Sequence, residues 1–392
     1  MRFPQRFSQL PEYAFPRLRS LLDAHAPGGD VLHMSIGEPK HPFPDWVTDE
    51  IAANADGFGR YPPNEGAPAL REAITGWVAR RYGVTLDPET QVMALNGTRE
   101  GLYNIAMALC PESAGATPAV LMPNPFYQVY AVAALSVGAE PVYVPATADT
   151  GFLPDYAALP AALLDRTELV YLCSPANPQG AIADKSYWAG LIQLAETHDF
   201  RIVADECYSE IYRDAPPPGA LEVAAEIGAD PDRVIAVHSL SKRSNVPGLR
   251  SGFVATGARN MARIRQLRAF AGAPLPLPIQ MASARLWADE AHVAANRALY
   301  ARKFDIADEI FTGVEGCAAP HGGFFLWLPV ADGEAAALKL WRETGIRVLP
   351  GAYLSREVDG RNPGAGYIRV ALVAPEEEMQ SGLVRLRDCL FA

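Results

Sequence analysis

The strongest constraint on the fold is a regular alternation between residues 91 and 256, where short apolar runs alternate with longer stretches of helical periodicity. Apolar runs that are rich in β-branched residues and separated by helices are typical of a mostly parallel sheet with helices on both faces. The pattern therefore predicts an α/β fold around a seven-stranded sheet. The expected strands are 91–95, 119–122, 141–144, 169–173, 201–204, 234–238 and 252–255, and the expected helices include 99–109, 127–137 and 185–197.

The alternation stops at residues 275–278, which are Leu-Pro-Leu-Pro. One long helix is expected at 280–310, followed by strands at 323–328 and 367–372, and this order is typical of a smaller α+β domain. The first 45 residues are rich in proline and lack the alternation. We therefore expect an N-terminal arm that belongs partly to the small domain (1–45), a large domain (46–278) and a small C-terminal domain (279–392).

The charge balance and the cysteines argue against several classes of function. The formal net charge is −11, from 34 basic and 45 acidic residues, and no cluster of Lys and Arg would serve to bind nucleic acid. No apolar run reaches the roughly 18 residues that span a bilayer. The five cysteines are scattered and the histidines lack metal-binding spacing, so no metal site is expected. These features predict a soluble, cytoplasmic protein without nucleic-acid or membrane partners.

Polar residues follow four of the expected strands, at the ends where open α/β sheets bind their ligands. Residues 96–100, Asn-Gly-Thr-Arg-Glu, indicate a glycine turn into a helix whose free N–H groups can hold an anion. The same residues also make an ordinary helix cap. The other three motifs are Ser-Pro-Ala-Asn-Pro (174–178), Asp-Glu-Cys-Tyr (205–208) and Ser-Leu-Ser-Lys-Arg (239–243). Because strand ends share one edge of the sheet, these side chains can converge on one site.

Lys242 and Asp205 are the strongest candidates for chemistry. Neighbouring cations such as Arg243 lower the pKa of a lysine amine and favour imine formation at Lys242, whereas the alternative is a solvated surface loop. Asp205 ends an apolar run, where a carboxylate needs a partner such as a protonated ring nitrogen, a helix N-terminus or an ion pair. The sequence contains no Gly-x-Ser-x-Gly, no Gly-x-Gly-x-x-Gly and no phosphate loop ending in Gly-Lys-Ser/Thr. Hydrolase, dinucleotide and nucleoside-triphosphate functions therefore lack support.

Taken together, these motifs resemble the fold-type I aminotransferases that use pyridoxal 5′-phosphate. The resemblance extends from Ser-Ile-Gly-Glu-Pro (35–39) to Gly-Tyr-Ile-Arg (366–369) and rests on the order and spacing of several motifs. It implies that the large domain binds this cofactor and that the chain forms a homodimer. It also implies that a small-molecule amino donor and a keto acid react in turn, with ping-pong kinetics.

The resemblance assigns roles to individual residues around the cofactor. It implies that Lys242 forms the internal aldimine and then moves the substrate proton, and that Asp205 pairs with the pyridine nitrogen. The ring hydroxyl is expected to meet Tyr208 and Asn177, and the ring is expected to stack on Tyr127. The residues implied for the phosphate are Thr98 and Arg99 (through backbone N–H), Ser239, Ser241, Arg250 and, from the neighbouring subunit, Tyr61.

The substrate is expected to meet a smaller set of residues. By the same resemblance, Gly37 and Asn177 lie against the substrate, and Arg369 holds its α-carboxylate as a bidentate pair. The residue after Asn177-Pro178 is Gln179, where the broad class usually has threonine. Since glutamine can still donate a hydrogen bond, this departure affects only the local detail.

Several local sequences resemble one narrower family, the proteobacterial succinyldiaminopimelate transaminases. They are residues 35–42, 96–100, 205–212, 238–252 and 362–367. That family exchanges an amino group between N-succinyl-LL-2,6-diaminopimelate and 2-oxoglutarate in the biosynthesis of diaminopimelate and lysine. Three alternatives remain: an aminotransferase for aspartate or another donor, a lyase on the same fold, and a non-catalytic binding protein, against which the intact Lys242, Asp205 and Arg250 argue.

Both substrates of the narrower family carry a second carboxylate, which calls for a second cation. Lys40 follows Gly37 by three positions, and Arg243 follows Lys242 directly. Both are charged where the broad class often is not, so we expect one or both to bind the distal carboxylate. The alternative is that they are solvated or paired with acidic side chains.

Overall fold

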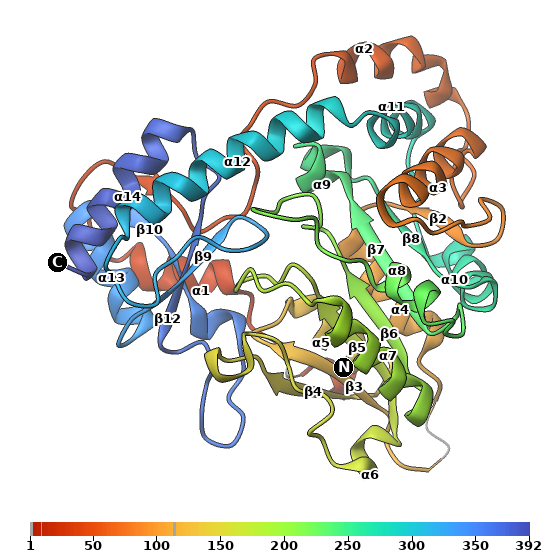
Figure 1. The fold of residues 1–392 in the computed structure, drawn as a ribbon, viewed down its shortest axis with the longest axis horizontal. Helices are drawn as coiled ribbons and strands as arrows, with labels where there is room; N and C mark the ends of the chain where they lie inside the picture. Colours follow the sequence, from red (N-terminus) through yellow and green to blue (C-terminus); the bar gives the residue numbers. More distant parts are fainter. Residues whose placement is uncertain (1–2, 9, 113–114) are drawn as a thin grey trace.

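The computed structural model describes residues 3–8, 10–112 and 115–392, and its largest sheet has seven strands in the order β2-β8-β7-β6-β5-β3-β4 (Figure 1). Neighbouring strands from β7 through β6, β5 and β3 to β4 are parallel, whereas β8 is antiparallel to both β2 and β7. The expected α/β class with a mostly parallel seven-stranded sheet is confirmed. The strands are β2 (Val92–Leu95), β3 (Ala119–Asn124), β4 (Glu140–Pro145), β5 (Thr167–Cys173), β6 (Arg201–Asp205), β7 (Val234–Ser239) and β8 (Gly252–Ala255).

Helices cover this sheet on both faces. Alternate residues of β5 show the two environments, because Leu169 and Tyr171 pack into one apolar cluster and Val170 and Leu172 into another. Successive side chains of a strand point to opposite faces, so a strand covered on both sides is apolar throughout. The first cluster includes α4 (Thr98–Leu109), α5 (Gln128–Ser136) and α10 (Ala258–Ala271), and the second includes α6 (Ala161–Leu164), α7 (Lys185–His198) and α8 (Ala220–Glu226).

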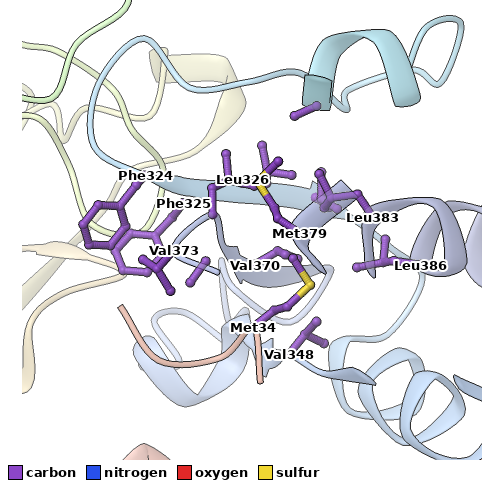
Figure 2. Close-up of a cluster of buried hydrophobic side chains, with 14 of the residues drawn as sticks. Met34, Phe324, Phe325, Leu326, Val348, Val370, Val373, Met379, Leu383 and Leu386 are labelled. Atoms are coloured by element: carbon purple, nitrogen blue, oxygen red, sulfur yellow. The ribbon is translucent and has the colours of Figure 1, made fainter. Parts of the chain in front are cut away.

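A second region contains two smaller sheets. One has the order β11-β12-β9 and is antiparallel, and in the other β1 pairs parallel with β10. Its apolar core extends from Leu386 and Leu383 on α14 to Phe324 and Phe325 at the start of β9 (Figure 2). Its elements are α1 (Ala14–Leu22), β1 (Leu32–His33), α12 (Ala291–Ile310), β9 (Phe325–Pro329), α13 (Gly333–Thr344), β10 (Ile346–Arg347), β11 (Leu349–Pro350), β12 (Tyr367–Ala371) and α14 (Glu376–Leu390).

The remaining elements lie at the edge of the large sheet or in connections. The helices α2 and α3 form an apolar cluster with α11, β2 and β8. Short helical turns connect many of the strands. These elements are η1 (Gln5–Phe7), α2 (Trp46–Ala53), η2 (Ala55–Gly59), α3 (Pro68–Tyr82), η3 (Ala148–Thr150), α9 (Leu240–Arg243), η4 (Pro247–Leu249), α11 (Leu277–Ala288) and η5 (Gly351–Leu354). In the described part of the chain, no helix is both long and apolar enough to cross a membrane.

The single helix expected at 280–310 is wrong, because the chain breaks between α11 and α12. Asp289 is extended, and its carboxylate accepts hydrogen bonds from the backbone N–H groups of Ala291 (3.2 Å) and His292 (3.4 Å), which starts a new helix. Figure 1 shows α12 running from the end of α11 toward α14. The division of domains at 278/279 stays a prediction. It falls within the first turn of α11, which packs against α2 and α3.

Candidate active site

A cavity of about 220 Å³ opens at the carboxyl ends of the central strands. Each of the four motifs that follow a strand contributes to its wall, as expected for ligand binding in an open α/β sheet. Ten of the residues expected at the cofactor line it: Thr98, Arg99, Tyr127, Asn177, Asp205, Tyr208, Ser239, Ser241, Lys242 and Arg250. Tyr130, Cys173, Cys207 and Pro247 complete the lining.

One end of the cavity has the donors that an anion requires. Gly97, at a φ of 81°, turns the chain into α4, so that the first N–H groups of this twelve-residue helix face the cavity end. The guanidinium of Arg250 lies so close to Gly97 that a Cβ atom there would overlap it. Ser239 and Ser241 add hydroxyl groups, and the Ser241 N–H donates to the Ser239 hydroxyl at 3.1 Å. Two hydroxyls, a guanidinium and a helix N-terminus suit a phosphate dianion.

Lys242 projects into the cavity from the short helix α9. Its ammonium donates a hydrogen bond to the Gly37 carbonyl and lies 5.3 Å from the centre of the Phe324 ring. Burial lowers its pKa to about 8, and Arg369 and Arg250 act in the same direction, while Cys207 and Glu38 act in the opposite direction. The sequence argument named neighbouring cations as the cause, but burial is the larger effect. A pKa near 8 leaves part of this lysine as a free amine at neutral pH.

Asp205 ends β6 as a buried carboxylate that faces no cation at ion-pair distance among the described residues. Burial raises its pKa, whereas hydrogen bonds from Cys207 and Tyr130 lower it. A buried carboxylate in this state is costly unless a ligand supplies the positive charge. A protonated ring nitrogen would do so.

Tyr130 is a site residue that the sequence argument missed. Its hydroxyl donates a hydrogen bond to Asp205 Oδ2 at 2.7 Å, and both groups are buried. The Tyr130 ring stacks on Tyr171, with ring centroids 4.5 Å apart and planes 11° apart. Three positions separate Tyr130 from Tyr127, which puts both on one side of α5 near its start. That spacing was the available signal, but it equally fits an ordinary apolar helix face.

Arg369 lies on β12, where it connects the two regions of the molecule. Its guanidinium donates to the side-chain oxygen of Asn177 at 3.0 Å and to the carbonyl of Ser35 at 2.8 Å. The remaining Nε is buried and has no hydrogen-bond partner among the described residues. Burial lowers the pKa of Arg369 to about 10. A buried cation with a donor to spare fits a carboxylate ligand.

The other residues expected near the ring and the substrate are Tyr127, Tyr208 and Gly37. The Tyr127 hydroxyl accepts a hydrogen bond from Arg99 Nε at 2.7 Å. The buried Tyr208 ring makes edge contacts with Phe324 and Phe325. Gly37 leaves no room for a Cβ atom, because one would overlap the Phe325 ring.

Arg243 does not bind at the cavity, so its expected role toward the distal carboxylate is wrong. Its side chain is 2 % exposed and forms an ion pair with Glu290 at 2.7 Å, while it also donates to the carbonyl of Leu286 at 2.7 Å. The guanidinium also lies 5.0 Å from the centre of the Trp287 ring. On a short helix, successive side chains point in different directions, so Arg243 is turned away from the cavity that Lys242 enters.

Two further predicted residues, Lys40 and Tyr61, lie outside the cavity lining, as do Gly37 and Arg369. Lys40 is exposed, and no ion pair involves it among the described residues. Tyr61 is fully exposed. Tyr61 was expected to act on a neighbouring subunit, and its placement within one chain leaves that expectation open. Among the described residues, no cluster of three or more His, Cys, Asp or Glu side chains could hold a metal ion.

Comparison with known proteins identifies the family of this chain. Residues 29–386 match the family described as Aminotransferase class I and II. The chain belongs to the class I and II aminotransferases. An LL-diaminopimelate aminotransferase of Dehalococcoides mccartyi is 32% identical over 400 residues, which cover 99% of both proteins.

Solved structures of similar proteins share this fold over nearly the whole chain. An aminotransferase from Neisseria meningitidis Z2491 superposes with a TM-score of 0.94 at 38% identity, over 98% of this chain and 99% of the other. A Thermus thermophilus protein described as a "probable N-succinyldiaminopimelate aminotransferase" has a TM-score of 0.83 at 25% identity, over 96% of this chain and 100% of the other.

The aminotransferases of this family use pyridoxal phosphate and act on an amino donor and a keto acid. The donor set in the cavity fits that cofactor. The end near Gly97 offers donors for a phosphate, Asp205 is a buried carboxylate without a cation, and Lys242 is a partly neutral amine. These three features match the phosphate, the ring nitrogen and the aldehyde of the cofactor.

The contact between Tyr130 and Asp205 leads to a test by pH. The hydroxyl of Tyr130 lowers the pKa of Asp205, so Tyr130→Phe should raise it. As the pH is lowered, the Asp205 carboxylate of the variant would therefore become protonated earlier, at a higher pH than in the unaltered protein. We expect the acid limb of the kcat/KM profile to move to higher pH, with a loss of about tenfold on that limb.

Tyr171→Phe is the matched control, because the buried Tyr171 hydroxyl donates to the Leu102 carbonyl at 2.7 Å and does not touch Asp205. Both variants lose one buried hydrogen bond. An acid limb that moves equally in both, or in neither, would contradict the role assigned to Tyr130.

Proposed function

We propose that the chain transfers an amino group from a diaminopimelate-type donor to 2-oxoglutarate, with N-succinyl-LL-2,6-diaminopimelate as the donor. The observation that supports the reaction most is the placement of three charged groups that have no ion-pair partner among the described residues. Lys242 and Asp205 line the cavity, and Arg369 donates a hydrogen bond to Asn177 of the cavity wall. Lys242 would bond to the cofactor aldehyde, Asp205 would pair with the protonated ring nitrogen, and Arg369 would pair with the α-carboxylate of the substrate. The donor is supported by the local sequence resemblance and by the similarity to the Thermus thermophilus protein described above.

A second donor, LL-2,6-diaminopimelate without the succinyl group, is favoured by a different observation. The Dehalococcoides mccartyi protein named for that substrate matches 99% of this chain at 32% identity. The two donors differ at one end only. A free amine there is positively charged, whereas a succinyl group ends in a negatively charged carboxylate, so the two donors need binding groups of opposite charge. They can therefore be separated by one selectivity measurement.

The residues of this chain divide the work of amino transfer. When bound, pyridoxal phosphate supplies an aldehyde that bonds amines and a ring that accepts electrons from the substrate Cα. Asp205 holds a proton on the ring nitrogen and so keeps that ring electron-poor. Arg369 binds the α-carboxylate and orients the Cα–H bond. Lys242 Nζ accepts the proton from Cα, which its pKa of about 8 allows near neutral pH.

Other residues of the cavity would hold the cofactor in place for these steps. Thr98, Ser239, Ser241, Arg250 and the Arg99 N–H group would bind its phosphate, Tyr127 would stack on its ring, and Asn177 and Tyr208 would meet its hydroxyl. We also propose a homodimer in which Tyr61 of one subunit meets the phosphate bound by the other. The fully exposed Tyr61 ring supports this arrangement.

Replacing Lys242 tests the proposed chemistry. Lys242→Ala should abolish the visible absorbance that depends on the bond between lysine and cofactor. It should also lower kcat by several orders of magnitude, because both the amine and the proton carrier are lost. Absorbance spectra and steady-state rates would measure both effects.

Lys303 provides the matched control, since burial also lowers its pKa to about 8. Its ammonium donates to the carbonyls of Leu372 (3.2 Å) and Ala374 (2.6 Å), and it does not line the cavity. Lys303→Met should keep the absorbance. If Lys242→Ala retained near-normal turnover, Lys242 would not be the catalytic lysine.

A panel of donors tests the substrate. We expect kcat/KM with 2-oxoglutarate to be highest for N-succinyl-LL-diaminopimelate, and at least about tenfold lower for LL-diaminopimelate and for aspartate. Highest efficiency with LL-diaminopimelate would select the second donor. Turnover of any donor without a keto acid would instead indicate a lyase.

Lys40 is the remaining cation proposed for the distal carboxylate. Because it lies outside the cavity, it can meet only a substrate that extends beyond it. Lys40→Gln should cost the succinylated donor about 1.5–3 kcal/mol in transition-state binding and leave a short monocarboxylic donor nearly unchanged. Arg243→Gln is the comparison variant. It should lower thermal stability without changing the ratio of kcat/KM between the succinylated and the short donor. An equal loss for both donors in Lys40→Gln would remove Lys40 from substrate recognition.

A further inference from the structure

Asn296, a buried residue of α12, joins three segments of the chain behind Lys242. Its Oδ1 lies 2.9 Å from His41 Nδ1 and accepts a hydrogen bond from Asn245 Nδ2 at 3.0 Å. Its Nδ2 donates to the backbone carbonyl of Lys242 at 3.4 Å. Asn245 also donates to the Pro42 carbonyl at 3.3 Å, so the segment containing His41 is held at two points.

The three contacts fix both the amide of Asn296 and the tautomer of His41. The Asn245 amide nitrogen is a donor and the Lys242 carbonyl is an acceptor, so the Asn296 oxygen must face Asn245 and its nitrogen must face Lys242. His41 then meets an oxygen and must carry a proton on Nδ1. The three hydrogen bonds of Asn296 are therefore formed together in one arrangement only.

The same network reaches the amine of Lys242 by a second route. Gly37, four residues before His41, accepts the hydrogen bond from Lys242 Nζ. The His41 ring packs against Tyr300 at 4.7 Å, and Tyr300 stacks on Phe324 at 5.5 Å. Phe324 is the ring that lies 5.3 Å from Lys242 Nζ. The segment 37–41 therefore touches the lysine at its amine, while Asn296 touches it at its backbone.

The helix that carries Lys242 needs such support. The helix α9 has only four residues, and the last carbonyls of a helix have no partner within it. Within the described residues, it is the Asn296 side chain that donates a hydrogen bond to the Lys242 carbonyl. Where that carbonyl is held, the direction of the lysine side chain into the cavity is held as well.

We propose that Asn296 is a positioning residue. By donating to the Lys242 carbonyl it sets the position and direction of Lys242, and by its contact with His41 it anchors the segment 37–41. Asn296 does not line the cavity, so it acts through Lys242 and not on the cofactor. The proposal rests on the role proposed for Lys242. It predicts that loss of the Asn296 amide misplaces the lysine but leaves the binding of the cofactor's phosphate and ring intact.

Two forms of the cofactor separate positioning from binding. Pyridoxal phosphate has an aldehyde, with which the Lys242 amine condenses to form a C=N bond and release one water. Pyridoxamine phosphate lacks the aldehyde and can only bind. Apoenzyme is mixed with each compound, and absorbance gives the rate of bonding for the first and a dissociation constant for the second.

We expect Asn296→Ala and Asn296→Asp to bond pyridoxal phosphate about tenfold more slowly, with the dissociation constant of pyridoxamine phosphate unchanged. The rates are compared on their alkaline plateau, where a raised lysine pKa no longer contributes. Asn296→Asp keeps the acceptor for His41 and Asn245 but has no donor for Lys242. Bonding at the unaltered rate in Asn296→Asp would overturn the proposal.

Asn260→Ala is the matched control. Asn260 is similarly buried and also fully engaged, since it donates to the Asp232 carbonyl and accepts from Arg201, but it lies on α10 outside the cavity. It should change neither measurement. Weaker pyridoxamine phosphate binding in the Asn296 variants would indicate a general loss of structure and overturn the proposal. No bonding in Lys242→Ala, together with normal bonding in the Asn296 variants, would refute this inference while supporting the proposed function.

Discussion

The site depends on charged groups that the fold removes from water without giving them a charged partner. Buried Glu210, by contrast, meets the guanidinium groups of both Arg81 and Arg297. At the cavity, Asp205 and Arg369 are buried and have only neutral hydrogen-bond partners among the described residues. Burying an ion in this way costs several kcal/mol. In the function that we propose, a cofactor and a substrate with the opposite charges would relieve this cost, so binding and chemistry would depend on the same two buried charges.

At the ends of the large sheet's strands, successive side chains point alternately toward the cavity and away from it. Asp205 faces the cavity, while the next residue, Glu206, meets His238 at 3.2 Å and accepts from the Ala220 N–H at 2.8 Å. Because successive residues point to opposite sides, the ends of the same two strands supply both a reactive group and a structural polar contact. His238 in turn precedes Ser239 of the cavity. The contact between Glu206 and His238 thus connects the ends of β6 and β7.

Periodicity in the sequence predicted the seven strands and the motifs that follow them, because apolar runs and strand ends are local features. Lys242, Asp205 and Arg369 were recognisable from motif spacing and family resemblance. Tyr130 and Asn296 were not, since a tyrosine on an apolar helix and an asparagine in a long helix have no local mark of function. Their roles arise from contacts across 75 and 54 residues of sequence. Arg243 was misjudged for the converse reason, because adjacency to Lys242 in sequence does not give adjacency in space.

The order of the strands has a consequence for synthesis of the protein. The strand β2 at the sheet edge pairs only with β8, which the ribosome makes after the other five strands of that sheet. Two residues of the cavity wall also contact distant parts of the chain: Lys242 donates to Gly37 near its start, and Asn177 accepts from Arg369 on β12, the last strand in sequence. Pairings between such distant segments form late in folding. A nascent chain therefore leaves β2 without its partner until β8 (Gly252–Ala255) has been made, and it lacks Arg369 until translation is nearly finished. A product truncated before residue 369 would lack the arginine that we propose for the substrate α-carboxylate.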